Sequence, residues 1–221
     1  MNFINAKKKA LILVMAATLS LNAFAAPPKP SDNISILKAN ITKYYNDGSY
    51  EKDLKVAIAK GITELKSVKK LPGNAAFVFD IDETALSNMP YEKNYDYAYI
   101  PKAWDDWIDS AKAPAIPAVK GFYDDLRKMG VKIIFITGRP QSQYGATYMN
   151  LRVEGYNTFD TLICKPPAMR GKKAVEYKSK TRKDLSKKYS IIGSIGDQAS
   201  DLEGGFTKIK IKLPNYMYYI E

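Results

Sequence analysis

The 221-residue chain is 46% hydrophobic, which suits one globular domain with a proper core. It contains no histidine, and this excludes a Ser-His-Asp hydrolase, a phosphohistidine enzyme and any histidine-ligated zinc site. The formal net charge is +11, but the lysines are scattered and no aromatic-basic motif of the usual nucleic-acid-binding modules appears. We therefore interpret the positive charge as a solvated basic surface. The alternative is an electrostatic field that attracts small anions such as phosphate esters.

Residues 1–25 have the three-part pattern of a cleaved signal peptide. Three lysines at 7–9 precede an apolar stretch, and Ala-Phe-Ala at 23–25 supplies the small residues of a cleavage site. A membrane anchor is the alternative, but the apolar run is short and no stop-transfer cluster follows it. Cleavage would remove the three lysines and no acidic residue, which lowers the net charge to +8. We expect an exported protein, periplasmic or secreted, without a stable membrane anchor.

After a proline-rich spacer at 26–32, a single domain is predicted over 33–221. The first helix is expected to begin near Ser31 or Asp32, either of which could be its N-cap. A second helix is expected over 50–69, ended by the Leu-Pro-Gly-Asn stop signal that follows it. The predicted buried faces of the two helices consist of Ile34, Leu37, Ile41, Tyr44 and Tyr45, and of Leu54, Ala57, Ile58, Ile62 and Leu65.

The segment 75–79 (AAFVF) is a dense apolar run, typical of a central strand buried on both faces. Two carboxylates, Asp80 and Asp82, follow it directly. Burying an ionised carboxylate costs several kcal/mol unless a cation or hydrogen bonds offset it. The pair therefore indicates a bound metal, a proton shared between the two acids, or both.

Residues 89–112 are rich in tyrosine and tryptophan and poor in aliphatic residues, which fits neither a core strand nor an ordinary helix. We interpret the segment as a cap-like insertion over the end of the sheet, whose rings would clamp a flat or apolar substrate group. A surface insertion with its aromatic rings packed inward is the equal alternative. The rings concerned are Tyr91, Tyr95, Tyr97, Tyr99, Trp104 and Trp107.

Further along the chain, helices and strands are expected to alternate. A helix over 117–129 is predicted to end at Gly130, with Val119, Phe122, Tyr123, Leu126 and Met129 on its apolar face. A strand over 131–137 ends at Thr137, and Pro140 favours a new helix directly after it. Thr137 and the amides behind it would then suit an anion, because a strand exit would face a helix N-terminus.

The last third of the sequence adds strands near 160–164 and 190–195 and an alternating edge strand over 207–213. Cys164, the only cysteine, lies in the first of these and is interpreted as a buried small hydrophobe. A basic helix is expected around 180–188, with Lys178 just before it. Asp197 and Asp201 follow the strand at 190–195, and their spacing of four places both on one side of a turn.

These elements together predict the α/β class: a Rossmann-like, mostly parallel sheet with helices on both faces and a helical segment at its N-terminal side. The exits of parallel strands meet at one edge, where ligands bind at the reversal of strand order. The side chains of Asp80, Asp82, Thr137, Asp197 and Asp201 can therefore converge there.

Four motifs resemble, in order and spacing, those of the haloacid dehalogenase superfamily of phosphatases. The resemblance is closest to the acid phosphatase branch (subfamily III), which includes plant vegetative storage proteins and bacterial class B and class C acid phosphatases. It covers roughly residues 33–215. The motifs are D-I-D-E-T at 80–84, I-T-G-R at 136–139, Y-K-S at 177–179 and G-D-Q-A-S-D-L at 196–202.

The resemblance implies that Asp80 attacks phosphorus and forms an aspartyl-phosphate, while Asp82 exchanges protons with the leaving alcohol and the attacking water. It further implies that Thr137, Gly138 and Lys178 hold the phosphoryl oxygens, although Lys172, Lys173 and Lys180 are nearby candidates for the lysine. Mg²⁺ is implied as cofactor. Its expected ligands are Asp80, the backbone carbonyl of Asp82 and Asp197, with Asp201 binding through water or orienting the others.

The sequence therefore predicts an exported, Mg²⁺-dependent acid phosphatase acting on small phosphate monoesters, with nucleotide or aryl phosphates suggested by the aromatic segment. Two alternatives stay open. One is a phosphotransferase, in which a second alcohol replaces water at the phosphoenzyme. The other is a non-catalytic storage or binding protein of the same fold, as some plant relatives of this branch are.

Overall fold

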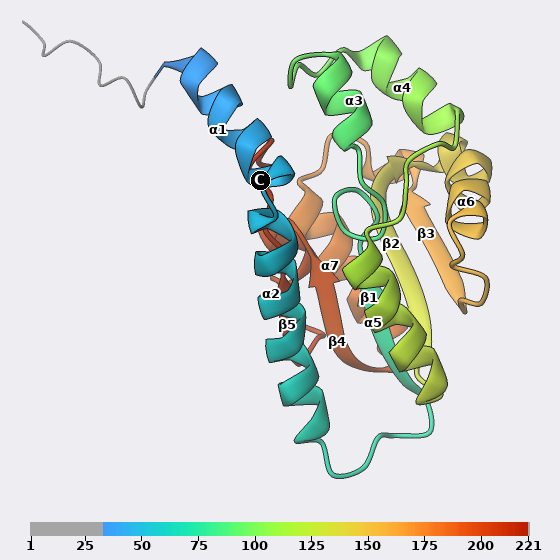
Figure 1. The fold of residues 1–221 in the computed structure, drawn as a ribbon. Coiled ribbons are helices and arrows are strands. Elements are labelled where there is room, and N and C mark those ends of the chain that lie inside the picture. The colour runs from blue at the N-terminus through green and yellow to red at the C-terminus, as the bar shows by residue number, and fades with distance from the viewer. Residues whose placement is uncertain (1–32, 221) are drawn as a thin grey trace, which may run out of the picture.

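The computed structural model describes residues 33–220 as helices arranged around one central sheet (Figure 1). The elements in chain order are α1 (Ile34–Asn46), α2 (Ser49–Lys66), β1 (Ala75–Phe79), α3 (Met89–Asn94), α4 (Pro101–Asp109), α5 (Pro117–Lys128), β2 (Lys132–Pro140), η2 (Gln141–Gln143), α6 (Tyr144–Val153), β3 (Thr161–Lys165), η3 (Pro167–Met169), α7 (Ala174–Leu185), β4 (Ser190–Gly196), η4 (Ala199–Asp201) and β5 (Ile209–Lys212). The expected signal peptide and spacer lie outside the described residues.

The sheet has five strands in the order β3-β2-β1-β4-β5, and each of its four pairings is parallel. The predicted α/β class and mostly parallel sheet are confirmed. Strand order proceeds outward from β1 in both directions, so the reversal lies between β1 and β4. The loops that leave these two strands carry Asp80 and Asp197, at the position where ligands bind in open α/β sheets.

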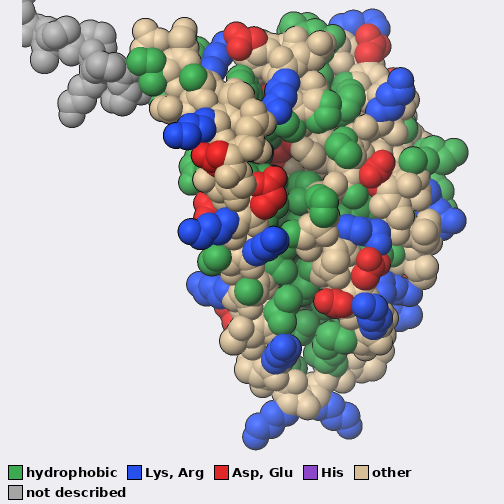
Figure 2. All heavy atoms as spheres, viewed as in Figure 1, with side chains coloured by type: hydrophobic (Ala, Val, Ile, Leu, Met, Phe, Trp, Pro, Cys, Tyr) green, Lys and Arg blue, Asp and Glu red, His purple; other side chains and the backbone are tan. Residues whose placement is uncertain are grey.

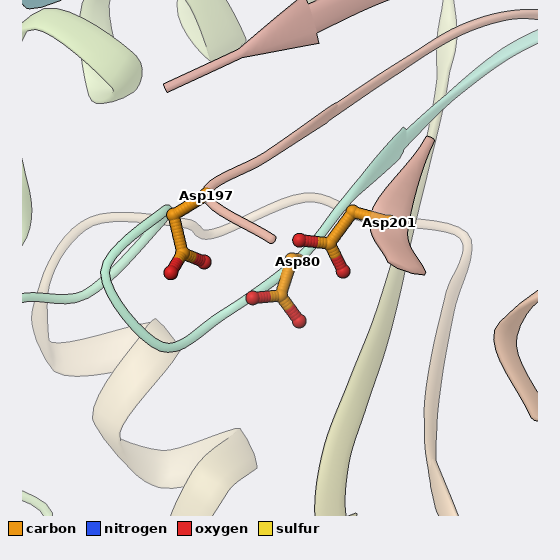
Figure 3. Close-up of side chains that lie close together, drawn as sticks. All are labelled: Asp80, Asp197 and Asp201. Carbon is orange, nitrogen blue, oxygen red and sulfur yellow. The ribbon is translucent and has the colours of Figure 1, made fainter. Parts of the chain in front are cut away.

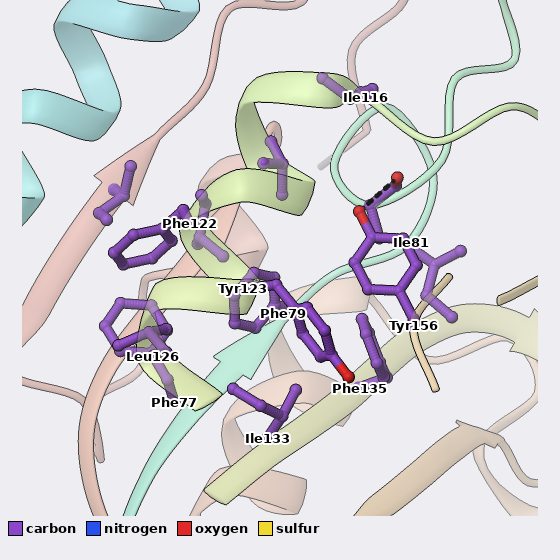
Figure 4. Close-up of a cluster of buried hydrophobic side chains, with 14 of the residues drawn as sticks. Phe77, Phe79, Ile81, Ile116, Phe122, Tyr123, Leu126, Ile133, Phe135 and Tyr156 are labelled. Atoms are coloured by element: carbon purple, nitrogen blue, oxygen red, sulfur yellow. Dashed lines mark hydrogen bonds between the residues drawn. The ribbon is translucent and has the colours of Figure 1, made fainter. Parts of the chain in front are cut away.

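A layer of aromatic side chains fills the space between the sheet and α5 (Figure 4). Phe77 and Phe79 of β1 meet Phe122 of α5 with ring centroids 5.2 and 6.0 Å apart. The hydroxyl of Tyr156 donates to the carbonyl of Ala85, 2.9 Å away, and so fixes the loop after β1 to this core. On the other face, Tyr177 of α7 packs against residues of β1 and β2, so helices cover both sides.

The N-terminal helices match their predictions in part. Leu54, Ile58 and Leu65 of α2 are buried, as expected. The apolar face predicted for α1 is only partly correct, because Ile34 and Leu37 are exposed, although the two tyrosines near its end pack against the core. Neither Ser31 nor Asp32 lies among the described residues; the N-cap is Asn33, whose side chain accepts a hydrogen bond from Ser35 N at 2.9 Å.

Three boundaries differ from the sequence predictions. β2 runs through Pro140, which pairs with Lys165 of β3, so the helical segment after it begins only at Gln141, with η2 followed by α6. Proline fits because its backbone is extended (φ −66°, ψ 154°) at the end of the strand. α7 begins at Ala174, so Lys178 lies inside this helix and not before it. Met129 is half-exposed beyond the end of α5.

The segment predicted as cap-like contains two short helices, α3 and α4, which lie above the carboxyl ends of the strands in Figure 1. The expectation that no ordinary helix forms here is therefore wrong. Proline at the first turn of each helix explains why they form, since its fixed φ suits that position. Whether the segment acts as a cap stays a prediction.

Basic and acidic side chains are interspersed over the face of the molecule seen in Figure 2, with apolar atoms visible between α2 and α5. This distribution fits the solvated basic surface predicted from the scattered lysines. None of the helices within residues 33–220 combines the length and apolar composition needed to cross a bilayer.

Candidate active site

Three buried aspartates from two strand exits meet at the carboxyl edge of the sheet (Figure 3). Asp80 follows β1, Asp197 follows β4, and Asp201 ends the short helix η4. One carboxylate oxygen from each lies within 4.8 Å of the other two. Glycine is needed at position 196, because a Cβ there would lie 2.2 Å from Asp201 Oδ2. The tight turn that brings Asp201 back against the end of β4 therefore depends on this residue.

Lys178 is the lysine that reaches the aspartate cluster. Its Nζ donates to Asp80 Oδ1 at 2.7 Å and also to Asp201 Oδ1. Both ion pairs are buried. Burial lowers the pKa of Lys178, but the two carboxylates outweigh that effect and hold the pKa above its usual value. Of the nearby candidates, Lys180 instead pairs with Asp184 on the surface.

Asp82 lies apart from this cluster and is held by Arg139. The guanidinium donates from its Nη2 to Asp82 Oδ1 at 2.7 Å and from its Nε to Oδ1 and Oδ2 at 3.1 and 3.2 Å. Asn88 adds a donor to Oδ1 at 2.9 Å. Burial raises the pKa of Asp82, yet the Arg139 charge and these hydrogen bonds overcome it and hold the pKa below its usual range.

Thr137 and Gly138 lie near the end of β2, directly before Arg139 in the chain. Thr137 is fully buried, and its hydroxyl accepts a hydrogen bond from Arg139 N at 3.1 Å. Gly138 borders the cavity described below. Because β2 continues to Pro140, the helix predicted behind Thr137 begins later than expected, at Gln141 with η2 and at Tyr144 with α6.

A second layer of side chains fixes Asp197 and Asp201. Asn215 Nδ2 and Gln198 Nε2 donate to Asp197 Oδ2 at 2.7 and 2.6 Å. Arg182, a fully buried side chain of α7, donates to the carbonyls of Asp201 at 2.8 Å and Gly205 at 3.1 Å. Arg182 therefore holds the loop that carries Asp201. Sequence reasoning missed these residues because nothing in their local spacing marks them.

The electrostatics of the cluster favour a divalent cation. Burial, reinforced by the charge of Asp201, raises the pKa of Asp80 well above its usual value. The same two causes raise the pKa of Asp197 to about 6, although the Asn215 and Gln198 hydrogen bonds oppose them. Three carboxylates and one ammonium leave two negative charges, which a hard ion with oxygen ligands would neutralise. The residues therefore fit a divalent metal.

A cavity of about 700 Å³ opens above the cluster. One side is formed by Tyr97, Tyr99 and Trp104 from the segment that contains α3 and α4. Lys165 and the adjacent lysines 172 and 173 form another side. The remaining aromatic residues have other roles: Tyr91, for example, is buried and packs edge-on against Trp104.

Residues beyond β5 close the cavity on a further side. Tyr218 and Ile220 line it. The Tyr218 hydroxyl donates to Glu83 Oε2 at 2.6 Å, and Ile220 N donates to Gln198 Oε1 at 3.0 Å. No signal in the sequence assigned this segment to the site.

Comparison with solved structures shows similarity to the class C acid phosphatase of Bacillus anthracis, which has been determined with tungstate bound. The TM-score is 0.71 at 26% identity, over 84% of this chain and 86% of that one. The soybean (Glycine max) stem 28 kDa glycoprotein is 35% identical over 207 residues, covering 90% of this chain and 80% of the relative.

The chain covers less than two thirds of the length of two other relatives. The tomato (Solanum lycopersicum) acid phosphatase 1 is 35% identical over 67% of this chain and 60% of its own length. A soybean stem 31 kDa glycoprotein is 38% identical, and the chain spans 63% of its length.

A family profile described as HAD superfamily, subfamily IIIB (acid phosphatase) matches residues 15–221, which is nearly the whole chain. The prediction of the acid phosphatase branch from the four motifs is confirmed, and with it, at the level of the family, the prediction of a phosphomonoesterase. The chain belongs to the subfamily IIIB acid phosphatases of the HAD superfamily.

Proposed function

We propose that this protein hydrolyses small phosphate monoesters through an aspartyl-phosphate formed on Asp80. The observation that carries the proposal is the contact of Lys178 with both Asp80 and Asp201 inside a buried aspartate cluster. A carboxylate can act as nucleophile toward phosphorus, and an adjacent ammonium offsets the charge of an incoming phosphoryl group. Thr137 and Gly138 are proposed to help Lys178 bind the phosphoryl oxygens.

Asp82 is proposed to move the protons. In the first step the Asp80 carboxylate forms a bond to phosphorus, the ester P–O bond breaks, and Asp82 gives its proton to the departing alcohol oxygen. In the second step water attacks phosphorus, Asp82 takes a proton from it, and the Asp80 carboxylate is released. The depressed pKa of Asp82 leaves it ionised in the free protein. An approaching phosphate dianion favours its protonated form, because like charges raise a carboxyl pKa.

Asp80, Asp197 and Asp201 would hold the divalent cation, which we propose to be Mg²⁺, with the Asp82 carbonyl as a further oxygen ligand. When bound, the cation would screen the charge repulsion between an anionic nucleophile and an anionic ester. We further propose export, supported by the signal-peptide pattern at residues 1–25. The aromatic side of the cavity supports esters with a flat group, such as aryl or nucleoside phosphates.

Phosphate release from 4-nitrophenyl phosphate by the purified protein, with Mg²⁺ or with EDTA, tests the proposal. Asp80→Asn should abolish turnover while preserving the circular dichroism spectrum, and EDTA should abolish turnover of the unsubstituted protein reversibly. Asp125→Asn, an exposed aspartate on α5, is the matched control and should retain full activity. Substantial turnover by Asp80→Asn would reject the nucleophile assignment.

A non-catalytic storage role has one observation in its favour. Vegetative storage proteins 1 and 2 of Arabidopsis thaliana are each 36% identical over 149 residues. The intact contact of Lys178 with both Asp80 and Asp201 opposes that role, because storage requires no such arrangement. No hydrolysis of any common phosphomonoester with added Mg²⁺ would support it.

A further inference from the structure

Asn88 occupies a buried position between the aspartate that we assign to proton transfer and helix α4. Its side-chain Nδ2 donates to Asp82 Oδ1 at 2.9 Å and to Glu83 Oε2 at 2.8 Å. Its Oδ1 accepts from the indole Nε1 of Trp107 at 2.8 Å. Asn88 has no exposed surface, so water does not compete for these bonds. One amide therefore joins the loop after β1 to α4.

The orientation of this amide is fixed by chemistry. An indole N–H can only donate, so it must face the amide oxygen. The ionised Asp82 carboxylate can only accept, so it must face the amide nitrogen. A flipped Asn88 would lose its bonds to Trp107 and Asp82 and place its oxygen against the Asp82 carboxylate. Trp107 therefore holds the NH₂ group of Asn88 on the Asp82 side.

Glu83 anchors the other side of Asn88. Its backbone lies in the left-handed region (φ 53°), an uncommon conformation for a glutamate. Its carboxylate is buried and accepts from Asn88 N and from the Tyr218 hydroxyl, each at 2.6 Å. This conformation turns the Glu83 side chain to the position where it can bind both the main chain and the side chain of Asn88.

The two oxygens of Asp82 have unequal partners as a result. Oδ1 accepts from Asn88 Nδ2 and from Nη2 and Nε of Arg139, whereas Oδ2 accepts only from Arg139 Nε, at 3.2 Å, among the described residues. A carboxyl oxygen that accepts fewer hydrogen bonds is the more basic one and is the one free to carry a proton. Oδ2 is thus the oxygen available to the leaving group.

We infer that Asn88 is a positioning residue that saturates Asp82 Oδ1 and leaves Oδ2 to exchange the proton, with Trp107 holding Asn88 in place from α4. The inference rests on the proposed function of Asp82. During the first step the proton on Oδ2 passes to the alcohol oxygen as the P–O bond breaks, and the electron pair of that bond remains on the alcohol. α4 also carries Trp104, which lines the cavity, so the same helix borders the cavity and is linked to Asp82 through Trp107 and Asn88.

The dependence of rate on the leaving group tests this inference. An alkyl phosphate such as glycerol phosphate needs protonation as it leaves, whereas 4-nitrophenolate leaves readily as an anion. The value of kcat/KM reports the first chemical step only, so a shared second step does not obscure the comparison. Asp82→Asn is the reference variant, because it removes the proposed general acid. General acid catalysis contributes about 10²–10⁴-fold to the rate.

Asn88→Ala is expected to lose at least about tenfold more kcat/KM on glycerol phosphate than on 4-nitrophenyl phosphate, as an incomplete loss of general acid catalysis. Trp107→Phe keeps a ring and removes the indole donor, so it should show the same preference to a smaller extent. Trp107→Phe can also replace Asn88→Ala in this test if Asn88→Ala does not fold. Asp109→Asn, at an exposed position on the same helix, is the control and should leave kcat/KM for both esters unchanged.

Equal losses on both esters in Asn88→Ala and Trp107→Phe would overturn the inference, provided that Asp82→Asn shows the leaving-group dependence. If Asp82→Asn itself shows no such dependence, the proposed role of Asp82 fails, and the inference about Asn88 fails with it. The two failures are therefore distinguishable.

Discussion

Replacing Arg139 by methionine would remove the guanidinium that compensates Asp82 and leave its largely buried carboxylate poorly neutralised. The Arg139 side chain is 1% exposed and that of Asp82 19% exposed, so solvent cannot take over the role of the guanidinium. After the substitution Asp82 would keep one side-chain donor, from Asn88. Breaking a buried ion pair from one side costs about 3–5 kcal/mol. The partial exposure of Asp82 favours the lower end, about 3 kcal/mol.

Urea denaturation at pH 7, followed by circular dichroism, measures this loss in the free energy of unfolding. A domain of this size loses about 2–4 °C of Tm per kcal/mol, so Tm should fall by roughly 6–12 °C. Arg170→Met is the matched control, because Arg170 is exposed and its substitution should change stability by less than about 0.5 kcal/mol. A loss below about 1 kcal/mol in Arg139→Met would refute the reasoning.

The pH dependence of the free energy of unfolding provides an independent test of this reasoning. Asp82 has a depressed pKa in the folded protein, so its contribution is present above the unfolded pKa of about 3.9 and is lost as pH falls through the folded pKa. Without Arg139, burial would raise the folded pKa above the unfolded value, which favours the protonated folded state at lower pH. The gap in stability between the two proteins should therefore narrow from pH 7 to pH 5. A constant gap would contradict this account of Asp82.

Three further predictions follow from buried groups elsewhere. Burial raises the pKa of Glu92 to about 7 from 4.5, so stability should fall as pH rises through that window, and Glu92→Gln should remove up to about 3 kcal/mol of this dependence in urea titrations at pH 5 and 8. Gly193→Ala places a Cβ 2.2 Å from Phe77 Cε2 and should cost about 1–3 kcal/mol, whereas Gly121→Ala, with open space in α5, should stabilise by up to about 1 kcal/mol in thermal melts. Arg182→Met should weaken Mg²⁺ binding about 10–100-fold by calorimetry, because the loop carrying Asp201 loses its donors; unchanged affinity with normal folding would show that the loop holds its shape without them.

Local pattern and topology were sufficient to predict which acidic side chains meet at the edge of the sheet. A dense apolar run before Asp80 and a glycine-flanked turn before Asp197 mark two strand exits, and a parallel sheet brings such exits to one edge. The structure places those two side chains and Asp201 together. Lys178 was also identified, although its helix was predicted to begin six residues too late, because the lysines at 172 and 173 that precede the helix give no clear start signal.

The residues that escaped prediction act over long sequence distances. Arg139 stood inside a quoted motif, but nothing in the motif showed that its partner would be Asp82, 57 positions away. Nothing in the local sequence marks Asn88 or Tyr218, because their hydrogen-bond partners are brought to them only by the folded chain. Pro140 was interpreted from its preference for helix starts, whereas its fixed φ suits an extended strand end equally well.

The contacts made by the segment after β5 affect the order in which the site can form during synthesis. Asn215 and Tyr218 supply donors to Asp197 and Glu83, and Tyr218 lies 135 positions beyond Glu83 in the chain. On the ribosome these acids are made first and remain without those donors until translation has passed Tyr218. A chain truncated after β5 would therefore keep all five strands of the sheet yet lack one side of the cavity.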